Sequence, residues 1–190
     1  MRAIFTALTI GSLLTGCASA PPSAMPARQQ VDNFALEARF ALRVSAPDQA
    51  SQNTGGRLSW THKNGSDRVL ISNPLGYGLA EIDTTPTLSR LRTADGKSRE
   101  STDAEALIEE VTGQRLPVTR LAAWLLGRPS ETAQIDSDQQ QRPTRLREAG
   151  WQVDYIYPDE TVSALPVRLT LSRDHDIELL LRIEEWIANP

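Results

Sequence analysis

The sequence of 190 residues contains one cysteine, Cys17, and two histidines, His62 and His175. A single cysteine has no partner for an internal disulfide. Neither histidine stands with other Cys, His or carboxylate residues at the spacing of metal ligands, and Asp174-His175-Asp176 is better explained as a hairpin turn. The sequence therefore predicts neither a disulfide-stabilised fold nor a metal site.

Signatures of catalysis and of nucleic-acid binding are also missing. There is no Gly-x-Ser-x-Gly turn, no phosphate-binding loop and no zinc-protease helix. The acids of EALIEE (105–110) lie early in an expected helix, where the helix dipole explains them. The net charge of −4 offers no basic excess for nucleic acid. We predict a protein that is not an enzyme and uses no cofactor; catalytic carboxylate pairs are assembled by the fold and carry no sequence motif.

The apolar run from Ala3 to Leu14 is too short to cross a bilayer comfortably as a helix. Arg2 precedes it and LTGC ends it, which is the layout of a secretory signal. LTGC resembles the bacterial lipobox, and this resemblance implies cleavage before Cys17 and lipid attachment to its sulfur. We predict a signal peptide at 1–16 and a lipid anchor at Cys17. The alternative is an ordinary signal whose boundary happens to contain a cysteine.

The segment after Cys17 is small, polar and rich in proline: ASAPPSAMPARQQ. Such a composition is typical of an extended, flexible tether. We therefore predict a lipidated N-terminus and tether at 17–30, with a helical turn around 27–35. The remaining residues, 31–190, have the length of one domain.

Alternation of apolar and polar residues predicts a mainly β domain. The segment 34–45 places six apolar residues at strict spacing two. Further strands are expected within 55–62, 66–73 and 76–83, and hairpins within 87–101, 144–158 and 163–190. Short strands at regular spacing predict an antiparallel sheet that curls or closes.

The period changes to helical in the middle of the chain. Residues 101–113 have a capping Ser101 or Thr102 and end at Gly113. A second helix is expected at 116–127, with Pro117 in its first turn. Two short helices in a β chain usually cover one face or end of the sheet. The polar segment 130–143 is expected to be a loop with at most one weak strand.

Several segments together resemble one family, the outer-membrane lipoprotein receptor LolB. No single segment is decisive, but their order and spacing are specific. They are the lipobox, FALEARFALRV, GGRLSW, ISNPLG, DAEALIEEVTGQRLPVTRLAAWLLGRP, GWQVDY, LPVRLTL and the closing Trp186. The resemblance implies an incomplete, strongly curved antiparallel β-barrel of about eleven strands, with a short α-helical lid, as in LolA and LolB.

The resemblance also implies a hollow for the acyl chains of a lipoprotein. The periplasmic carrier LolA would deliver this cargo, and the receptor, at the periplasmic face of the outer membrane, would release it into the phospholipid of the inner leaflet. We expect a monomer that binds no nucleic acid. Two other functions stay open: a scaffold lipoprotein with a filled barrel, and a lipid hydrolase.

Eleven apolar side chains are candidates for the lining of this hollow. For each, an ordinary packed core is the alternative, because alternation does not distinguish a filled barrel from a hollow one. The candidates are Phe40, Leu42, Leu58, Trp60, Val69, Leu107, Val111, Leu121, Trp124, Leu125 and Trp151.

The turn NPLGYG carries a large apolar residue where polar ones are usual. By its resemblance to the family, the turn projects Leu75 into solvent for delivery of cargo into the membrane. Pro74 and Gly76 shape the turn, and Tyr77 supports it as an aromatic that favours membrane interfaces. The alternative is that Leu75 folds back to cap the core.

Overall fold

The computed structural model describes residues 28–45 and 50–190. The predicted signal peptide, Cys17 and most of the predicted tether lie outside these residues. The described chain begins with a 3-10 helix, η1 (Arg28–Gln30), within the segment where a helical turn was expected. All later described elements belong to one sheet and two helices.

Eleven strands and two α-helices follow η1. In chain order they are β1 (Phe34–Val44), β2 (Gln52–Lys63), β3 (Ser66–Ser72), β4 (Gly78–Thr84), β5 (Ser89–Thr93), β6 (Ser98–Ser101), α1 (Ala104–Thr112), α2 (Val118–Leu125), β7 (Gln134–Ser137), β8 (Pro143–Glu148), β9 (Trp151–Ile156), β10 (Arg168–Arg173) and β11 (Ile177–Ala188).

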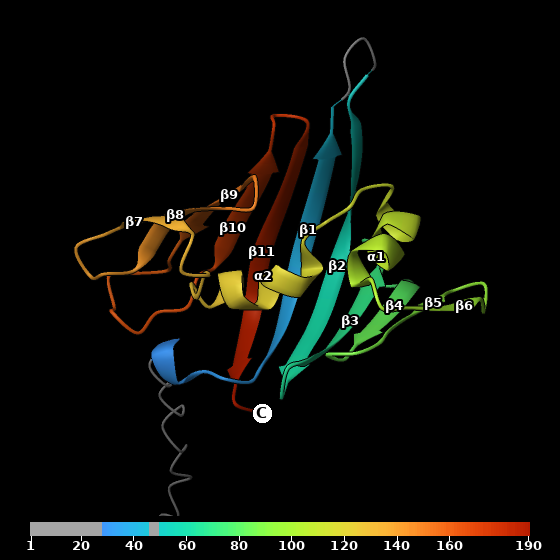
Figure 1. The fold of residues 1–190 in the computed structure, drawn as a ribbon, viewed down its shortest axis with the longest axis horizontal. Coiled ribbons are helices and arrows are strands. Elements are labelled where there is room, and N and C mark those ends of the chain that lie inside the picture. Colours follow the sequence, from blue (N-terminus) through green and yellow to red (C-terminus); the bar gives the residue numbers. More distant parts are fainter. Residues whose placement is uncertain (1–27, 46–49) are drawn as a thin grey trace, which may run out of the picture.

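The strands form one antiparallel sheet in the order β6-β5-β4-β3-β2-β1-β11-β10-β9-β8-β7. Strands that follow one another in the chain pair, except β6 and β7, which are separated by the two helices and form the edges. The first and the last strand meet at the centre, where β1 pairs with β11 along its whole length. Figure 1 shows these two strands side by side, with the helices in front of the sheet.

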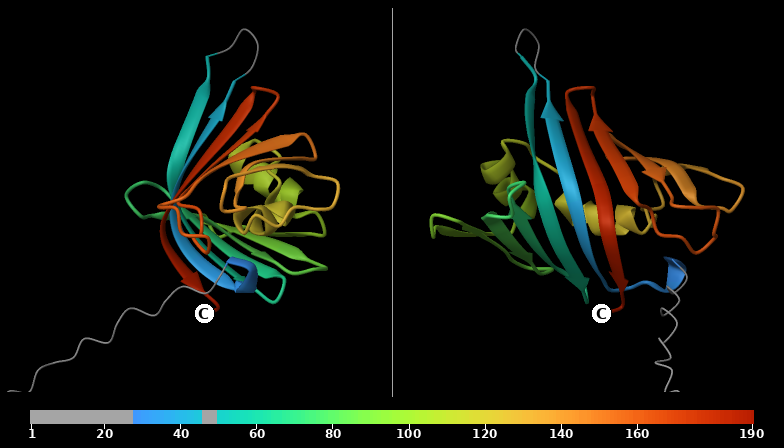
Figure 2. Two further views of the ribbon diagram at one scale, coloured as in Figure 1. Left: turned by 90° about the vertical axis from the view of Figure 1, so that its left-hand side faces the viewer. Right: turned by 180° about the vertical axis from the view of Figure 1, so that it is seen from behind.

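The sheet curves strongly around one side. Figure 2 shows the strands bending around α1 and α2, which lie on the concave face. Since the two edges do not pair, the barrel is incomplete. The predicted fold class, a mainly β, curved and open barrel with a helical lid, is confirmed.

Alternation along β1 shows how the sequence builds this layer. Leu36, Ala38 and Leu42 are buried on the concave face, whereas Glu37 and Arg39 between them are exposed on the convex face. Because side chains on a strand point to opposite faces in turn, each strand contributes one apolar row to the interior. These rows and the helices form a single core.

Two details of the helical region differ from the sequence analysis or refine it. The N-cap of α1 is Asp103, not Ser101 or Thr102: its carboxylate accepts a hydrogen bond from the Ala106 amide at 3.1 Å. The helix thus begins one residue later than expected, and the Ser101 hydroxyl instead accepts from the Asp103 amide at 2.9 Å. The weak strand in the polar segment 130–143 is β7.

Candidate functional site

A cavity of about 310 Å³ lies between the concave face of the sheet and the two helices. Its wall is formed by inward residues of β1–β4 and β11 and by α1, the α1–α2 connection and the first turn of α2. Seven of the eleven predicted residues line it, namely Phe40, Leu42, Leu58, Trp60, Val69, Val111 and Leu121. The lining is mostly aliphatic and aromatic, as in sites that enclose apolar ligands.

The other four predicted residues do not line the cavity. Leu107 is buried in the core and does not line the cavity, although Ile108 and Val111 of the same helix do. Trp124 and Leu125 lie in the second half of α2, which packs on solid core, so only the first turn of that helix faces the cavity. Trp151 starts β9 and stacks under the Arg173 guanidinium, 4.9 Å away, beside a separate polar depression at the hairpin ends.

Several lining residues escaped the sequence analysis. Strand alternation would have found Ile71, which lies two positions from Val69. Helical spacing would have found Ile108 from Val111. The residues that were missed are Ile71, Ile82, Ile108, Leu116, Val118, Leu179 and Leu181.

The lining of the cavity also contains several polar residues. Among the described residues that line the cavity, Asp67 is the only ionisable one. Its Oδ1 accepts from Trp60 Nε1 at 2.8 Å and lies 2.6 Å from His62 Nδ1. Its second oxygen accepts from the Thr84 hydroxyl at 3.2 Å. Both oxygens of the Asp67 carboxylate thus have partners within the protein. We therefore interpret Asp67 as a structural residue that fixes the Trp60 indole beside the cavity.

The second half of α2 is fastened to the sheet by a buried carboxylate at the end of β8. Glu148 accepts from Trp124 Nε1 at 2.7 Å and from Arg120 Nη1 at 2.8 Å, and more weakly from the Ser130 amide at 3.4 Å. Tyr155 also donates to the Trp124 carbonyl at 2.9 Å. Sequence analysis missed Glu148 because its partners lie 18 to 28 positions away in the chain.

The same contacts set the protonation of Glu148. Burial alone would raise the pKa of this carboxyl, but the hydrogen bonds from Trp124 and Ser130 and the charge of Arg120 outweigh it and lower the pKa. The ionised form is therefore the one that the folded protein stabilises.

Glu148→Gln is expected to lower the free energy of unfolding by about 2 kcal/mol at neutral pH, the typical contribution of a hydrogen bond to a buried charge. A carboxyl with a lowered pKa stabilises the fold above its unfolded pKa, and this contribution disappears as the pH falls through the folded value. The gap between variant and wild type should thus shrink below about pH 4.3, the ordinary glutamate pKa. Urea denaturation of both proteins at a series of pH values measures this difference in the free energy of unfolding. A difference that does not depend on pH would contradict the stabilising role of the ionised Glu148.

The NPLGYG turn joins β3 to β4 and holds its apolar tip outward. The Asn73 side chain accepts from the amides of Leu75 and Tyr77, each at 3.0 Å, and the Gly76 amide donates to the Asn73 carbonyl at 2.9 Å. Gly76 has a φ of 93°, which favours glycine. Leu75 is 83% exposed and Tyr77 70%, and Pro74 is exposed as well. Leu75 therefore does not fold back onto the core.

No helix in the described part of the chain combines the length and apolar character needed to cross a membrane. Within residues 28–45 and 50–190, no three His, Cys, Asp or Glu side chains gather where they could hold a metal ion.

The fold and the cavity define the class of open, strongly curved β-barrels that enclose an apolar space beneath helices. The fold is similar to that of a domain of a candidate outer membrane lipoprotein-sorting protein from Vibrio parahaemolyticus. The TM-score is 0.56 and the identity 9%, over 85% of this chain and 88% of that one.

The chain belongs to the outer membrane lipoprotein LolB family, whose model matches residues 32–186. It is 65% identical to the outer-membrane lipoprotein LolB of Dechloromonas aromatica over the full length of both chains. It is 36% identical to that of Azoarcus sp. over 95% of this chain and 92% of the relative.

Proposed function

We propose that this chain is an outer-membrane receptor that accepts acylated lipoproteins from the carrier LolA and inserts them into the inner leaflet of the outer membrane. The apolar cavity beneath α1 and α2 carries the proposal, and membership of the LolB family supports it. The reaction is a transfer between binding sites, with no bond made or broken, and the chain acts as a monomer without a cofactor.

The energetics of acyl chains make such a cavity necessary. Each methylene removed from water gains about 0.8 kcal/mol, so a sixteen-carbon chain represents about 11 kcal/mol. Exposure to water during transfer would be prohibitively slow, and the chains must pass from one apolar site directly into another. Transfer in one direction without nucleotide then requires increasing affinity from the carrier to the receptor and from the receptor to the bilayer.

The cavity must enlarge to accept cargo. At about 310 Å³ it lies at the lower end of the range for small-ligand pockets, and lipoproteins carry two or three chains. Of the two helices, α2 is fastened by the buried Glu148, whereas α1 is held to β6 by the exposed ion pair of Arg99 with Glu110, at 2.9 Å. Exposed pairs contribute little stability, so we propose that α1 is the helix that moves.

The N-terminal segments complete the proposal. Residues 1–16 would be removed as a signal peptide, Cys17 would carry the lipid anchor, and residues up to 30 would tether the single domain 31–190 to the membrane. The exposed Leu75, with Tyr77 beside it, would enter the leaflet while the cavity empties. One buried leucine contributes about 2 kcal/mol, enough to orient a tethered protein but not to hold it alone.

A transfer assay tests this function. Lipoprotein-loaded LolA is mixed with liposomes in the presence or absence of the lipidated chain, and vesicle-bound lipoprotein is measured by flotation. The proposal expects insertion only when the chain is present. Lipoprotein that stays with the carrier would instead favour the scaffold function, and release of free fatty acid over time would indicate a hydrolase.

A further inference from the structure

Four arginines stand in register across four neighbouring strands at the centre of the sheet. Arg39 of β1 is paired with Arg57 of β2 on one side and with Arg182 of β11 on the other. Arg182 is in turn paired with Arg168 of β10. Adjacent strands lie about 4.8 Å apart, so this arginine row is about 14 Å long.

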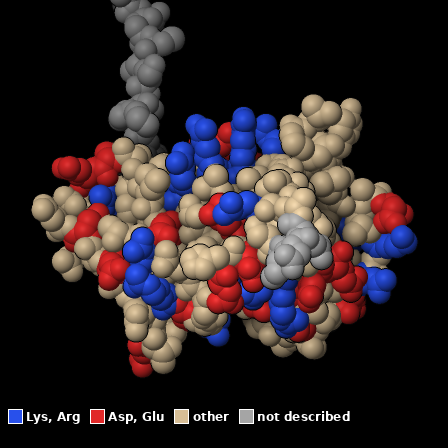
Figure 3. Space-filling model, turned by 90° about the horizontal axis from the view of Figure 1, so that it is seen from above, with Lys and Arg blue, Asp and Glu red and all other residues tan. Residues whose placement is uncertain are grey.

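The whole row is exposed on the convex face. Each of its arginines is exposed, while the strand neighbours that bracket Arg57 and Arg182 are buried on the concave side. Figure 3, a view from above, shows basic side chains gathered in a line at the upper edge of the molecule, next to an uncharged protrusion. Like charges placed directly opposite one another on a sheet are destabilising, so the row is unfavourable in the isolated domain.

Carboxylates on the protein neutralise this row only in part. Glu184 is shared between Arg39, at 2.7 Å, and Arg57, at 3.3 Å. Among the described residues, Arg168 and Arg182 have no ion pair. Two further acids, Glu37 on β1 and Glu185 on β11, are paired in register next to the row. The exposed cations therefore form a single line across the strands.

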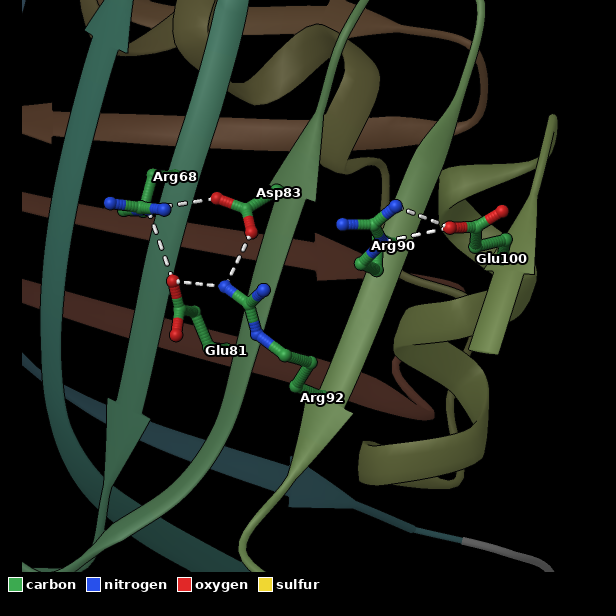
Figure 4. Close-up of polar contacts among 6 residues, drawn as sticks. All are labelled: Arg68, Glu81, Asp83, Arg90, Arg92 and Glu100. Carbon is green, nitrogen blue, oxygen red and sulfur yellow. Dashed lines mark hydrogen bonds and ion pairs between the residues drawn. The ribbon is translucent and has the colours of Figure 1, made fainter. Parts of the chain in front are cut away.

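The arginines on β3 and β5 are arranged differently. Figure 4 shows each of them against a carboxylate of a neighbouring strand. The pairs are Arg68 with Glu81 and Asp83, Arg92 with Glu81 and Asp83, and Arg90 with Glu100. Those arginines are neutralised within the protein. In the row, by contrast, two of the four arginines remain available to bind an external anion.

The row leads directly to the exposed apolar turn. Arg57, at its end, is paired with Ser72, the last residue of β3, and the NPLGYG turn begins at the next residue. The left view of Figure 2 shows the loop between β3 and β4 projecting from the convex side of the sheet. A line of cations beside an exposed leucine and tyrosine is the combination by which peripheral proteins bind anionic membranes.

We propose that the arginine row binds anionic phospholipid headgroups of the membrane that Leu75 enters. Guanidinium groups bind phosphate oxygens through paired hydrogen bonds, and each cation near an anionic surface strengthens binding about fivefold. The row would hold the part of the convex face beside the NPLGYG turn against the leaflet. This inference rests on the proposed function, because it assigns the membrane-facing surface of the same receptor.

The length of the chain before the fold permits this orientation. Eleven positions separate Cys17 from Arg28, the first described residue. A segment of that length spans at most about 40 Å when extended, comparable to the length of the central strands. An anchor at Cys17 would therefore not prevent the convex face from reaching the lipid surface.

The test uses the chain from Ala18 onward, which lacks the acylation site and keeps every described element. Sedimentation with vesicles measures its affinity for phosphatidylglycerol mixed with phosphatidylcholine, against phosphatidylcholine alone. The double variant Arg168→Gln/Arg182→Gln should bind the anionic vesicles at least about tenfold more weakly than the wild type. Arg90→Gln removes one exposed positive charge off the row and should bind within about twofold of the wild type, against the roughly fivefold loss expected for each arginine of the row.

Three results would overturn the assignment. The double variant could bind anionic vesicles like the wild type, or Arg90→Gln could lose as much affinity. The double variant could also keep vesicle binding and lose LolA, in which case the row is a protein-binding surface. Uptake of a fluorescent fatty acid, measured on the same variants, separates this inference from the proposed function: a wild type without saturable uptake would contradict the cavity, not the row.

Discussion

Leu75→Glu is expected to abolish insertion of lipoproteins into liposomes while acceptance of cargo from LolA continues. The side chain is 83% exposed at the tip of a hydrogen-bonded turn, so the fold does not depend on it. In the membrane, the substitution removes about 2 kcal/mol of stabilisation from burial of the leucine side chain, and it adds a charge that is unfavourable in lipid. Insertion should fall at least about thirtyfold, with the cargo retained in a stable complex with the variant.

Flotation of vesicles measures insertion in this experiment, and size-exclusion chromatography measures cargo bound to the receptor. Leu88→Glu is the matched control, because Leu88 is also exposed but lies in the loop between β4 and β5. The control should insert cargo like the wild type. Equal insertion by Leu75→Glu and wild type would show that the turn does not act in the membrane.

Val69→Trp is expected to reduce the affinity for a fluorescent fatty acid by about tenfold or more. Val69 lies on the inward face of β3, in register with Trp60 and Ile82, and all three line the cavity. A tryptophan there would fill space that acyl methylenes otherwise occupy. Exclusion of only two methylenes removes about 1.6 kcal/mol of binding energy.

Val162→Trp controls for the added aromatic surface, because Val162 is exposed in the segment between β9 and β10. Its affinity for the fatty acid should equal that of the wild type. Overpacking can also destabilise a core, so thermal unfolding is followed in parallel. A folded Val69→Trp variant with unchanged affinity would place the acyl site elsewhere.

Local pattern was sufficient to predict the sheet but not the contents of its interior. Alternation in β1 and helical spacing in α1 are set by near neighbours in the chain, so both elements were predictable. Alternation also identifies which side of a strand faces inward. Neither alternation in a strand nor apolar spacing in a helix shows where the inward side meets empty space, and this is why Leu107 of α1 and Trp124 of α2 were predicted to line the cavity although they pack in solid core.

Features that join distant parts of the chain were beyond single-sequence reasoning. The arginine row combines residues from the first two and the last two strands, and it exists only because β1 pairs with β11. Glu148 similarly meets Trp124 only when α2 folds back over β8. The Leu75 turn is the opposite case: its residue types and the family resemblance predicted an outward tip, and the structure has that geometry.

The central claim is that acyl chains lie between the sheet and the two helices. A lipopeptide with a photoreactive acyl chain, transferred from LolA and irradiated, tests it by mass spectrometry of the crosslinked residues. The account predicts crosslinks to the cavity wall from both layers, for example to Val69 on β3 and Leu121 on α2. Crosslinks confined to the convex face or to the polar depression near Trp151 would contradict it.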